Sequence, residues 1–520
     1  MPQEVRVSEP KGPSRRELMV GASVLGMAAC RSEAPEPDGR AQPAPPPDPH
    51  QVRKSGGKAH NLVVVLVDDQ RFDAASIAGH PFLKTPHMDA LATQGVWCRN
   101  AFVTTSLCSP SRATMLCGQY AHSHGVLNNQ TPLPEEVPTW PELVKKAGFR
   151  TAYVGKWHMG GASAEPRPHW DHWVSFPGQG RYVYPGQAGQ PEEKVFNING
   201  QPTAVSGYVT DLVTEQAVSW LKEQRAGNPF ALVVGHKACH APFTPAPRHA
   251  EVYKDERVPR PLPDTDTAYA GRPEWLRRMR ESMFGVEVLY NGRWKTFDEW
   301  YRDYHRTLLA VDEGLGRILQ ALDEQGLADD TLVVFTSDNG FMVGERGVLD
   351  KRCAYDESIR IPWFARLPGV IPEGTRCDEL VLNLDLPSTL LDAAGLIPPH
   401  TMEGRSILPM LRGEGPRWRD AILYEYFFER AFPQCPTVLA VRTRTAKLVS
   451  YHGVWERAEL FDLVSDPGET HNRIDDPEWA QKKQKLWRRM RGLLARHGGR
   501  WSPDWKAETQ PVPDEVVTEG

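Results

Sequence analysis

Four apolar runs rich in β-branched residues constrain the fold most strongly, because each ends abruptly in polar side chains. The runs are 61–67, 151–154, 230–235 and 331–336. Continuous apolar runs of this length are typical of strands buried on both faces of a parallel sheet. Helical patterns lie between or just before them, at 141–147, 211–225 and 301–325. We therefore predict an α/β fold with a large, mostly parallel sheet flanked by helices.

The residues that follow these four strands carry the predicted chemistry. They are Asp68 and Asp69, Lys156 and His158, His236 and His240, and Asp338 and Asn339. Open α/β sheets bind their ligands at the carboxyl ends of the strands. An acid after a strand often only caps a helix or starts a turn, but two acidic clusters on two similar strands favour a shared site. Their hard oxygen ligands suit Ca²⁺ or Mg²⁺ rather than zinc.

The composition excludes several classes of protein. The 61 Lys and Arg and the 66 Asp and Glu leave a net charge of -5, which argues against a general nucleic-acid binder or a polybasic membrane binder. A hydrophobic fraction of 40% is enough for a large core and excludes global disorder. The eight cysteines lack the paired spacing of a zinc site and are too few for a disulfide scaffold.

The first thirty residues resemble an export signal. Ser14–Leu18 contains a twin-arginine pattern, and a weakly apolar run ends in small residues before Cys30. This pattern predicts lipidation of Cys30, with a leader without lipidation or an ordinary signal peptide as alternatives. The proline-rich residues 31–58 are typical of an extended linker, so the folded part is predicted to begin near Lys58. We predict an exported protein of the periplasm or cell envelope, attached to the membrane through Cys30.

A cysteine at a predicted helix start is the candidate nucleophile. In the segment Cys108-Ser109-Pro110-Ser111-Arg112, Ser109 or its neighbour can cap a helix and Pro110 suits the first helical position. Cys108 then lies where free N–H groups favour an anion, and Arg112 offers a guanidinium group to oxyanions one turn later. The residues alone leave two interpretations open, a nucleophile in an anion pocket or a buried structural cysteine.

This segment resembles the C-x-P-S-R core of the type I, formylglycine-dependent sulfatase signature. Other segments resemble the same family in order, over about residues 60–500. They are 67–69, 155–160, 337–340, 350–362 and 459–470. The resemblance implies an alkaline-phosphatase-like catalytic domain over 59–410 and a smaller C-terminal α+β domain with an antiparallel sheet over 411–501. Residues 502–520 are predicted to be a tail.

The resemblance also implies a modified residue and a metal. Cys108 would be oxidised to formylglycine by a maturation enzyme, and the hydrated aldehyde would attack sulfur. Together with residue 108, four side chains would hold a metal ion, Ca²⁺ in preference to Mg²⁺. These side chains are Asp68, Asp69, Asp338 and Asn339.

Five further side chains receive roles from the resemblance. Arg112 would stabilise the residue-108 hydrate, while Lys156 and Lys351 would balance the sulfate charge. His240, or alternatively Lys351, would contact the ester oxygen and protonate the leaving alcohol. His158 would take a proton from the second hydroxyl of the hydrate.

One motif departs from the pattern of many relatives. They carry Gly-Glu-His-Gly before the lysine-bearing segment, whereas this chain has Gly344-Glu345-Arg346-Gly347. The arginine removes a possible histidine contact and adds a cation. We therefore predict that Arg346 contacts the substrate, which would suit an acidic or multiply sulfated ligand.

The remaining signals concern the substrate. Residues 169–173 and 178–182 are rich in Trp, His and Tyr, which stack on sugar rings but also form ordinary packed insertions. Segments 196–200 and 207–212 look like those of exported N-acetylglucosamine-6-sulfatase-like enzymes. We predict a sulfatase acting on O-sulfated glycans, with N-acetylglucosamine-6-sulfate as a candidate, or on small sulfate esters, and no nucleic-acid partner. The alternatives are a phosphonate or phosphate ester hydrolase on the same fold and an inactive, membrane-tethered relative that binds sulfated glycans.

Overall fold

The structure is a computed structural model that describes residues 46–185, 195–260, 271–280, 289–290, 293–294, 296–452 and 457–500. The predicted signal with Cys30, most of the proline-rich segment and the predicted tail lie outside these residues. None of the helices in these ranges is long and apolar enough to cross a membrane.

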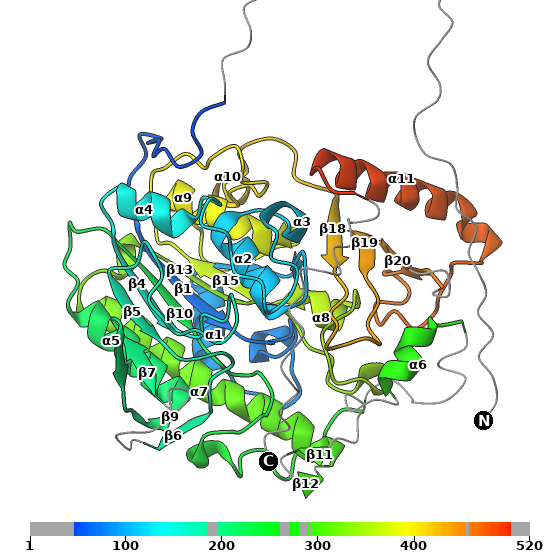
Figure 1. Ribbon diagram of the computed structural model, residues 1–520, viewed down its shortest axis with the longest axis horizontal. Helices are drawn as coiled ribbons and strands as arrows, with labels where there is room; N and C mark the ends of the chain where they lie inside the picture. The colour runs from blue at the N-terminus through cyan, green and yellow to red at the C-terminus, as the bar shows by residue number, and fades with distance from the viewer. Residues whose placement is uncertain are drawn as a thin grey trace, which may run out of the picture. The chain divides into compact units, whose positions relative to one another are not determined.

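A ten-stranded sheet forms the centre of the main compact unit (Figure 1). Its strands, in spatial order, are β16 (Thr375–Cys377), β2 (Val96–Cys98), β15 (Trp363–Arg366), β13 (Thr331–Ser337), β1 (Asn61–Val67), β10 (Phe230–Gly235), β4 (Arg150–Gly155), β5 (His172–Ser175), β7 (Phe196–Ile198) and β8 (Gln201–Thr203). The five strands from β13 to β5 are parallel to one another. Antiparallel pairs extend the sheet on both sides. The predicted large, mostly parallel sheet is therefore confirmed, with the parallel strands at its centre.

The two faces of this sheet pack against different helices. Along β1, Leu62, Val64 and Leu66 belong to one apolar core, while the alternate valines belong to another. The helices on the first face are α2 (Cys108–Cys117), α4 (Trp140–Lys146) and α9 (Leu386–Ala393), and those on the second are α1 (Pro86–Thr93), α5 (Val209–Lys222) and α7 (Phe297–Glu324). The three predicted helices are confirmed, with ends shifted by a few residues.

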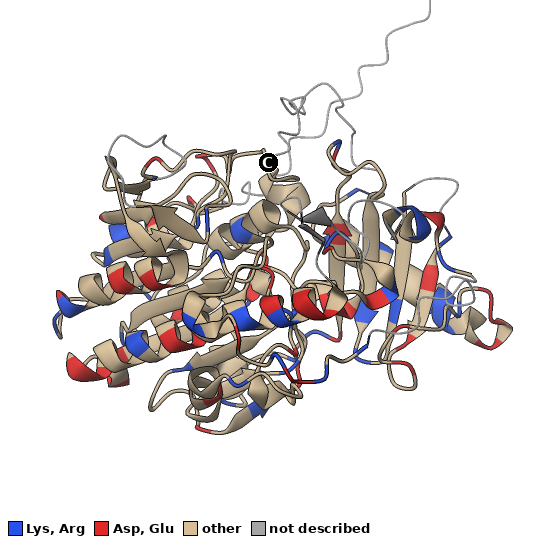
Figure 2. Ribbon diagram, turned by 90° about the horizontal axis from the view of Figure 1, so that it is seen from below, with Lys and Arg blue, Asp and Glu red and all other residues tan. Residues whose placement is uncertain are grey.

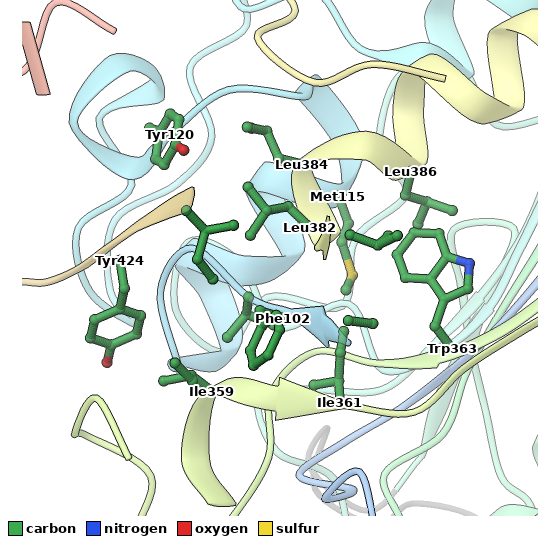
Figure 3. Packing of buried hydrophobic residues seen from close by; sticks show 14 of the residues in the cluster. Phe102, Met115, Tyr120, Ile359, Ile361, Trp363, Leu382, Leu384, Leu386 and Tyr424 are labelled. Carbon is green, nitrogen blue, oxygen red and sulfur yellow. The ribbon is translucent and has the colours of Figure 1, made fainter. Parts of the chain in front are cut away.

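Helix α2 is held by apolar contacts along its length, since all ten of its residues are buried. Figure 3 shows Met115 of this helix among Phe102, Leu384 and Trp363. Phe102 belongs to β3 (Ala101–Phe102), the central strand of a small sheet with β14 (Arg360–Ile361) and β17 (Val381–Leu382). This packing fixes the helix start, where the candidate nucleophile lies.

The predicted cap of α2 is wrong. The helix begins at Cys108, and Leu107 is its N-cap, so Pro110 lies in the first turn rather than at the first position. The Asn129 side chain accepts the Ser109 N–H at 3.0 Å, and the Ser109 hydroxyl donates to the His158 carbonyl at 2.6 Å. Distant segments therefore satisfy groups that we expected a local cap to satisfy.

A smaller antiparallel sheet follows in the C-terminal part, as predicted. Its strands are β18 (Ala421–Tyr426), β19 (Val438–Thr443), β20 (Ala446–Tyr451) and β21 (Glu459–Asp462), and helix α11 (Ala480–Arg496) packs across it (Figure 1). The Glu425 N–H donates to the Thr104 carbonyl at 2.8 Å, and the Tyr424 hydroxyl lies 2.6 Å from that of Ser106. The C-terminal sheet thus contacts the segment that leads into α2.

The remaining described elements are short. They are α3 (Ala121–His124), α6 (Glu274–Arg280), α8 (Asp356–Ile359), α10 (Leu408–Leu411), β6 (Val183–Pro185), β9 (Ser206–Tyr208), β11 (Leu289–Tyr290) and β12 (Arg293–Trp294). Strands β6 and β9 pair with each other, as do β11 and β12.

The folded part begins before the predicted position near Lys58, since the main compact unit starts at Asp48. The Ser55 N–H donates to the Gly395 carbonyl at 2.8 Å, and the His50 ring contacts Glu142 at 2.9 Å. The prolines that predicted a free linker end before His50, and the residues after them bind to the body of the protein.

Candidate active site

Three aspartates meet at the carboxyl ends of β1 and β13. Asp68 and Asp69 follow β1, Asp338 follows β13, and all three are at most 1% exposed. The Asp69 N–H donates to Asp338 Oδ1 at 3.2 Å, and one carboxylate oxygen from each acid lies within 4.8 Å of the others. Parallel strands bring these acids together, and such a group of oxygens could hold a divalent cation.

Two observations test whether a cation fits there. The buried Asn339 Oδ1 has no hydrogen-bond partner among the described residues, although its amide nitrogen donates to Asp69 Oδ1 at 2.5 Å. Burial raises the pKa of Asp69 to about 7 against the influence of Lys351, and repulsion by Asp68 and Asp338 adds to the rise. An unsatisfied amide oxygen beside crowded carboxylates fits an oxygen-binding divalent cation.

Cys108 lies directly beside these acids. Its Sγ is 3.6 Å from Asp68 Oδ1 and 2.9 Å from Lys351 Nζ, and the residue is fully buried. Burial raises the pKa of this thiol to about 12, although Lys351 opposes the rise. The helix start therefore holds a protonated thiol rather than the thiolate that a helix dipole alone would favour.

Three buried cations face the three carboxylates. Lys156 contacts Asp68, and Lys351 contacts Asp69. Arg112 donates through Nε to Asp338 Oδ2 at 2.8 Å and through a terminal nitrogen to the Lys156 carbonyl at 2.7 Å. Burial raises the pKa of Asp68, but Lys156 and His240 outweigh it and hold that pKa well below its usual range. The three cations therefore offset the three carboxylates in charge and hydrogen-bond with them.

Two of the predicted histidines enter this cluster. His240 Nε2 lies 3.9 Å from Asp69 Oδ2, while its Nδ1 lies 2.6 Å from the Ala241 carbonyl and can donate to it. His158 follows β4 with a φ of 50°, and its buried Nδ1 has no partner within the described ranges. Burial and the neighbouring Lys156 hold the pKa of both rings well below the usual value. Both rings can therefore accept a proton.

Two further residues near the cluster were not predicted. The Lys237 ammonium group is buried without a hydrogen-bond partner among the described residues, and lies 4.9 Å from the Tyr182 ring centroid. Burial, with repulsion from Lys156, lowers the pKa of Lys237 to about 7. Gln179 contacts Lys156 through its side-chain oxygen. Lys237 could have been found because it comes two residues after a buried strand, whereas nothing local marks Gln179.

The aromatic segments that we associated with sugar stacking are packed inside the protein. Trp173 is 1% exposed and stacks on Tyr153 with ring centroids 5.2 Å apart, and Trp170 meets the same ring edge-on. Tyr182 is also buried, and its hydroxyl donates to the His240 carbonyl at 2.7 Å. The alternative of an ordinary packed insertion therefore describes these aromatic residues.

The structure places Arg346 in a buried contact with the C-terminal part. Its guanidinium lies 3.9 Å from the Tyr355 ring centroid and donates to the Gly468 carbonyl at 2.7 Å. A carboxylate oxygen of Glu357 lies 3.4 Å from the same guanidinium. These intramolecular partners describe a residue that joins two regions of the chain, and its predicted substrate contact remains a prediction.

We expect Arg346→Ala to lower the free energy of unfolding by about 2 kcal/mol, because it removes a buried guanidinium and leaves the half-buried Glu357 and the Gly468 carbonyl without that partner. Denaturant unfolding measures this change. Arg376→Ala removes an exposed arginine that forms no ion pair among the described residues, and should cost less than about 0.5 kcal/mol. Equal unfolding midpoints for the two variants would contradict the structural role of Arg346. If Arg346→Ala changed the ratio of activities on charged and neutral sulfated sugars, that change would support the predicted substrate contact.

The fold and the site together define a hydrolase of the alkaline-phosphatase-like class, with an acidic cluster at the carboxyl edge of its sheet that could hold a metal ion. The sulfatase family model matches residues 60–396, and a model for the C-terminal part of N-sulphoglucosamine sulphohydrolase matches residues 344–496. The chain belongs to the sulfatase family and is a sulfuric ester hydrolase.

Individual relatives agree with this assignment. The N-acetylglucosamine-6-O-sulfatase of Bacteroides thetaiotaomicron is 30% identical over 490 residues, covering 84% of this chain and 86% of the relative. A solved structure of a protein with its substrate D-glucosamine-2-N,6-O-disulfate superposes with a TM-score of 0.78 at 29% identity, covering 86% of this chain and 100% of that one. The phosphonate monoester hydrolase of Agrobacterium radiobacter, at 24% identity and a TM-score of 0.70 over 84% and 96% of the two chains, shares the fold.

Proposed function

We propose that Cys108 is converted to formylglycine by a maturation enzyme and that the resulting hydrate is the nucleophile for sulfate esters. The observation that carries this proposal is the position of the Cys108 side chain, between Asp68 and Lys351 at the edge of the acidic cluster. Asp68, Asp69, Asp338 and Asn339, with residue 108, would hold a Ca²⁺ ion. The bound ion would supply Lewis-acid polarisation of the oxygens around it.

The buried cations position the sulfate group. Lys156, beside Asp68, and Lys351, beside Asp69 and residue 108, would contact the sulfate oxygens. Lys237, whose pKa is lowered to about 7, adds a further donor without a fixed partner among the described residues. Arg112 is held by Asp338 and by the Lys156 carbonyl, so it would hold the residue-108 hydrate in one orientation. Charge-assisted hydrogen bonds of this kind are short and directional.

The two histidines would handle different protons in two successive steps of the reaction. The hydrated aldehyde supplies an oxygen nucleophile for sulfur and a second hydroxyl whose deprotonation expels sulfate. His240 would face the ester oxygen with Nε2, because its Nδ1 is directed to a backbone carbonyl, and it would protonate the leaving alcohol once it has itself taken up a proton, with Lys351 as the alternative donor. His158 would take the proton of the second hydroxyl.

We further propose O-sulfated glycans as substrates, with N-acetylglucosamine-6-sulfate as the first candidate. Two similarities support this choice: the relative named N-acetylglucosamine-6-O-sulfatase and the structure bound to D-glucosamine-2-N,6-O-disulfate. The twin-arginine pattern and the cysteine at position 30 support an exported enzyme with a lipid anchor, since sulfated polysaccharides are met outside the cytoplasm. Arg346, if it contacts substrate, would favour a glycan with more than one sulfate.

Release of inorganic sulfate from a panel of defined sulfated saccharides tests the proposal. We expect kcat/KM for N-acetylglucosamine-6-sulfate to exceed that for its non-6-sulfated isomers by at least about tenfold. Sulfate and phosphate esters of one alcohol, assayed side by side, distinguish a sulfatase from the phosphonate or phosphate ester hydrolase suggested by the shared fold. Faster phosphate release would favour that alternative, and binding of glycan without any release would favour the inactive relative.

A further inference from the structure

Helix α11 differs in charge from the helices that cover the large sheet. It carries seven Lys and Arg and neither Asp nor Glu, although the whole chain has a net charge of -5. Figure 2 shows both signs of charge on the helices along the large sheet. The apolar side of α11 is buried on the C-terminal sheet through Leu486, Met490, Leu493 and Leu494. All the charged side chains of α11 are therefore cationic, and uncharged residues such as Gln481 and Gln484 lie between them on its exposed side.

This cationic side forms one wall of two adjoining hollows. Their volumes are about 440 and 740 Å³, and they share the wall formed by 417–421 and Arg489. Together they are lined by eight Lys and Arg and only three acids. We call these lining residues the basic face. No residue of the basic face belongs to the candidate active site.

Each acid of the basic face pairs with one basic residue of the same face. Glu379 contacts Arg444, Asp420 contacts Arg489, and Glu403 lies 2.8 Å from the His497 ring. Arg417, Lys485 and Arg496 are exposed, and none has an acidic partner in the part of the chain that the structure describes. The basic face thus carries a surplus of positive charge.

The positive charge of the basic face affects the pKa of one of its arginines, Arg405. Partial burial and the adjacent Arg419 lower the pKa of Arg405, and Arg496 adds to the effect while Asp385 opposes it. The guanidinium groups of Arg405 and Arg419 lie 4.5 and 4.8 Å from the Trp418 ring centroid. Arg419 is also paired with the buried Asp385, so Arg405 is the arginine that these contacts hold in place for an anion, which lowers the entropy lost on binding.

We propose that the basic face is a second binding site, separate from the active site, for the chain of a sulfated polysaccharide. Arginine forks match the oxygens of sulfate groups. Lys482, Lys485, Arg489 and Arg496 are spaced by three, four and seven residues, so they follow one side of α11 over about 21 Å. An elongated, hollowed row of cations fits a polyanionic chain better than a planar membrane surface. This inference rests on the proposed function for its ligand class.

The test compares two triple variants that remove the same charge. One changes Arg417, Lys485 and Arg496 of the basic face to alanine. The matched control changes three exposed cations outside the basic face to alanine: Lys222, Lys254 and Arg317. These three also have no acidic partner within the described residues. Binding of a defined sulfated octasaccharide is measured by calorimetry at several salt concentrations, in full-length protein that also carries Cys108→Ala to prevent turnover.

We expect the basic-face triple to raise the Kd for the octasaccharide at least about tenfold and to weaken its salt dependence, because fewer counterions are released. The control triple should change the Kd less than twofold. With Cys108 intact, both triples should retain the kcat of the parent enzyme on a monosaccharide sulfate, which shows that the active site is unaltered.

Other outcomes overturn the inference. Equal Kd values for the two triples, or an octasaccharide that fails to bind the parent protein, would remove the polysaccharide site. Binding to vesicles containing phosphatidylglycerol that is lost in the basic-face triple, with octasaccharide binding unchanged, would assign this surface to a membrane instead. If the proposed function is wrong, the parent enzyme will release no sulfate from any saccharide. The Kd values of the two triple variants would still show whether the basic face binds the octasaccharide.

Discussion

Replacement of Cys108 by alanine is expected to lower kcat for sulfate release by at least about 10⁴-fold. The change removes the only side chain at the start of α2 that can become the proposed nucleophile, and leaves the aspartate cluster in place. Cys108 is fully buried, so the smaller side chain should cost about 1–2 kcal/mol of stability. The measurement is single-turnover sulfate release, accompanied by thermal unfolding.

Cys117→Ala is the matched control. Cys117 ends the same helix and is equally buried, but no contact joins it to the aspartate cluster in the described structure. We expect its kcat to stay within about threefold of the parent value. Mass spectrometry of the tryptic peptide 100–112 of the active parent enzyme should show an aldehyde in place of the thiol. An unmodified thiol in fully active enzyme would contradict the proposed nucleophile.

Removal of the metal is expected to have the second large effect. Asp69→Ala should lower kcat/KM by at least about 10³-fold, and a chelator should inactivate the parent enzyme to a similar degree. Added Ca²⁺ should restore the chelated parent but not the variant. A free metal concentration of 100 times the Kd would stabilise the parent enzyme by about 2.7 kcal/mol. Chelation should therefore also lower the Tm of the parent enzyme. Asp329→Ala removes an exposed carboxylate just before the amino end of β13 and should change neither property.

The same site predicts a dependence of metal affinity on pH. Burial raises the pKa of Asp69 to about 7, so below that pH a proton must leave before the cation binds. Affinity for Ca²⁺ is therefore expected to fall by up to about tenfold for each pH unit below 7. Titration calorimetry at several pH values measures this slope. A flat profile between pH 5 and pH 7 would show that Asp69 is not a ligand.

The centre of the fold and the acidic cluster could be predicted because their signals are local. Strand β1 is buried on both faces, so its sequence is continuously apolar, and the acids come directly after it. The surroundings of Arg346 could not be predicted, since its partner Gly468 lies far along the chain. The aromatic residues near Trp173 were ambiguous because side chains that stack on sugars also fill cores.

The basic face shows a different limit of sequence reasoning. A net charge of -5 correctly argues against a protein that is cationic as a whole. It says nothing about how the charges are distributed, and α11 gathers seven cations without one acid. The second wall of the basic face, near Arg417, comes from a segment more than sixty residues earlier, which only the fold brings opposite α11.

The contacts of the C-terminal sheet have a consequence for protein engineering. Tyr424 and Glu425 bind the segment just before α2, and Lys447 lies 2.6 Å from Asp356 and 2.7 Å from Glu469 in a buried cluster. A chimaera that exchanged this sheet for that of another sulfatase would leave buried charges and hydroxyls without partners unless residues 104–106 and 356 were exchanged with it. To alter specificity, substituting surface residues of α11 should therefore be easier than exchanging the whole C-terminal sheet on which the helix packs.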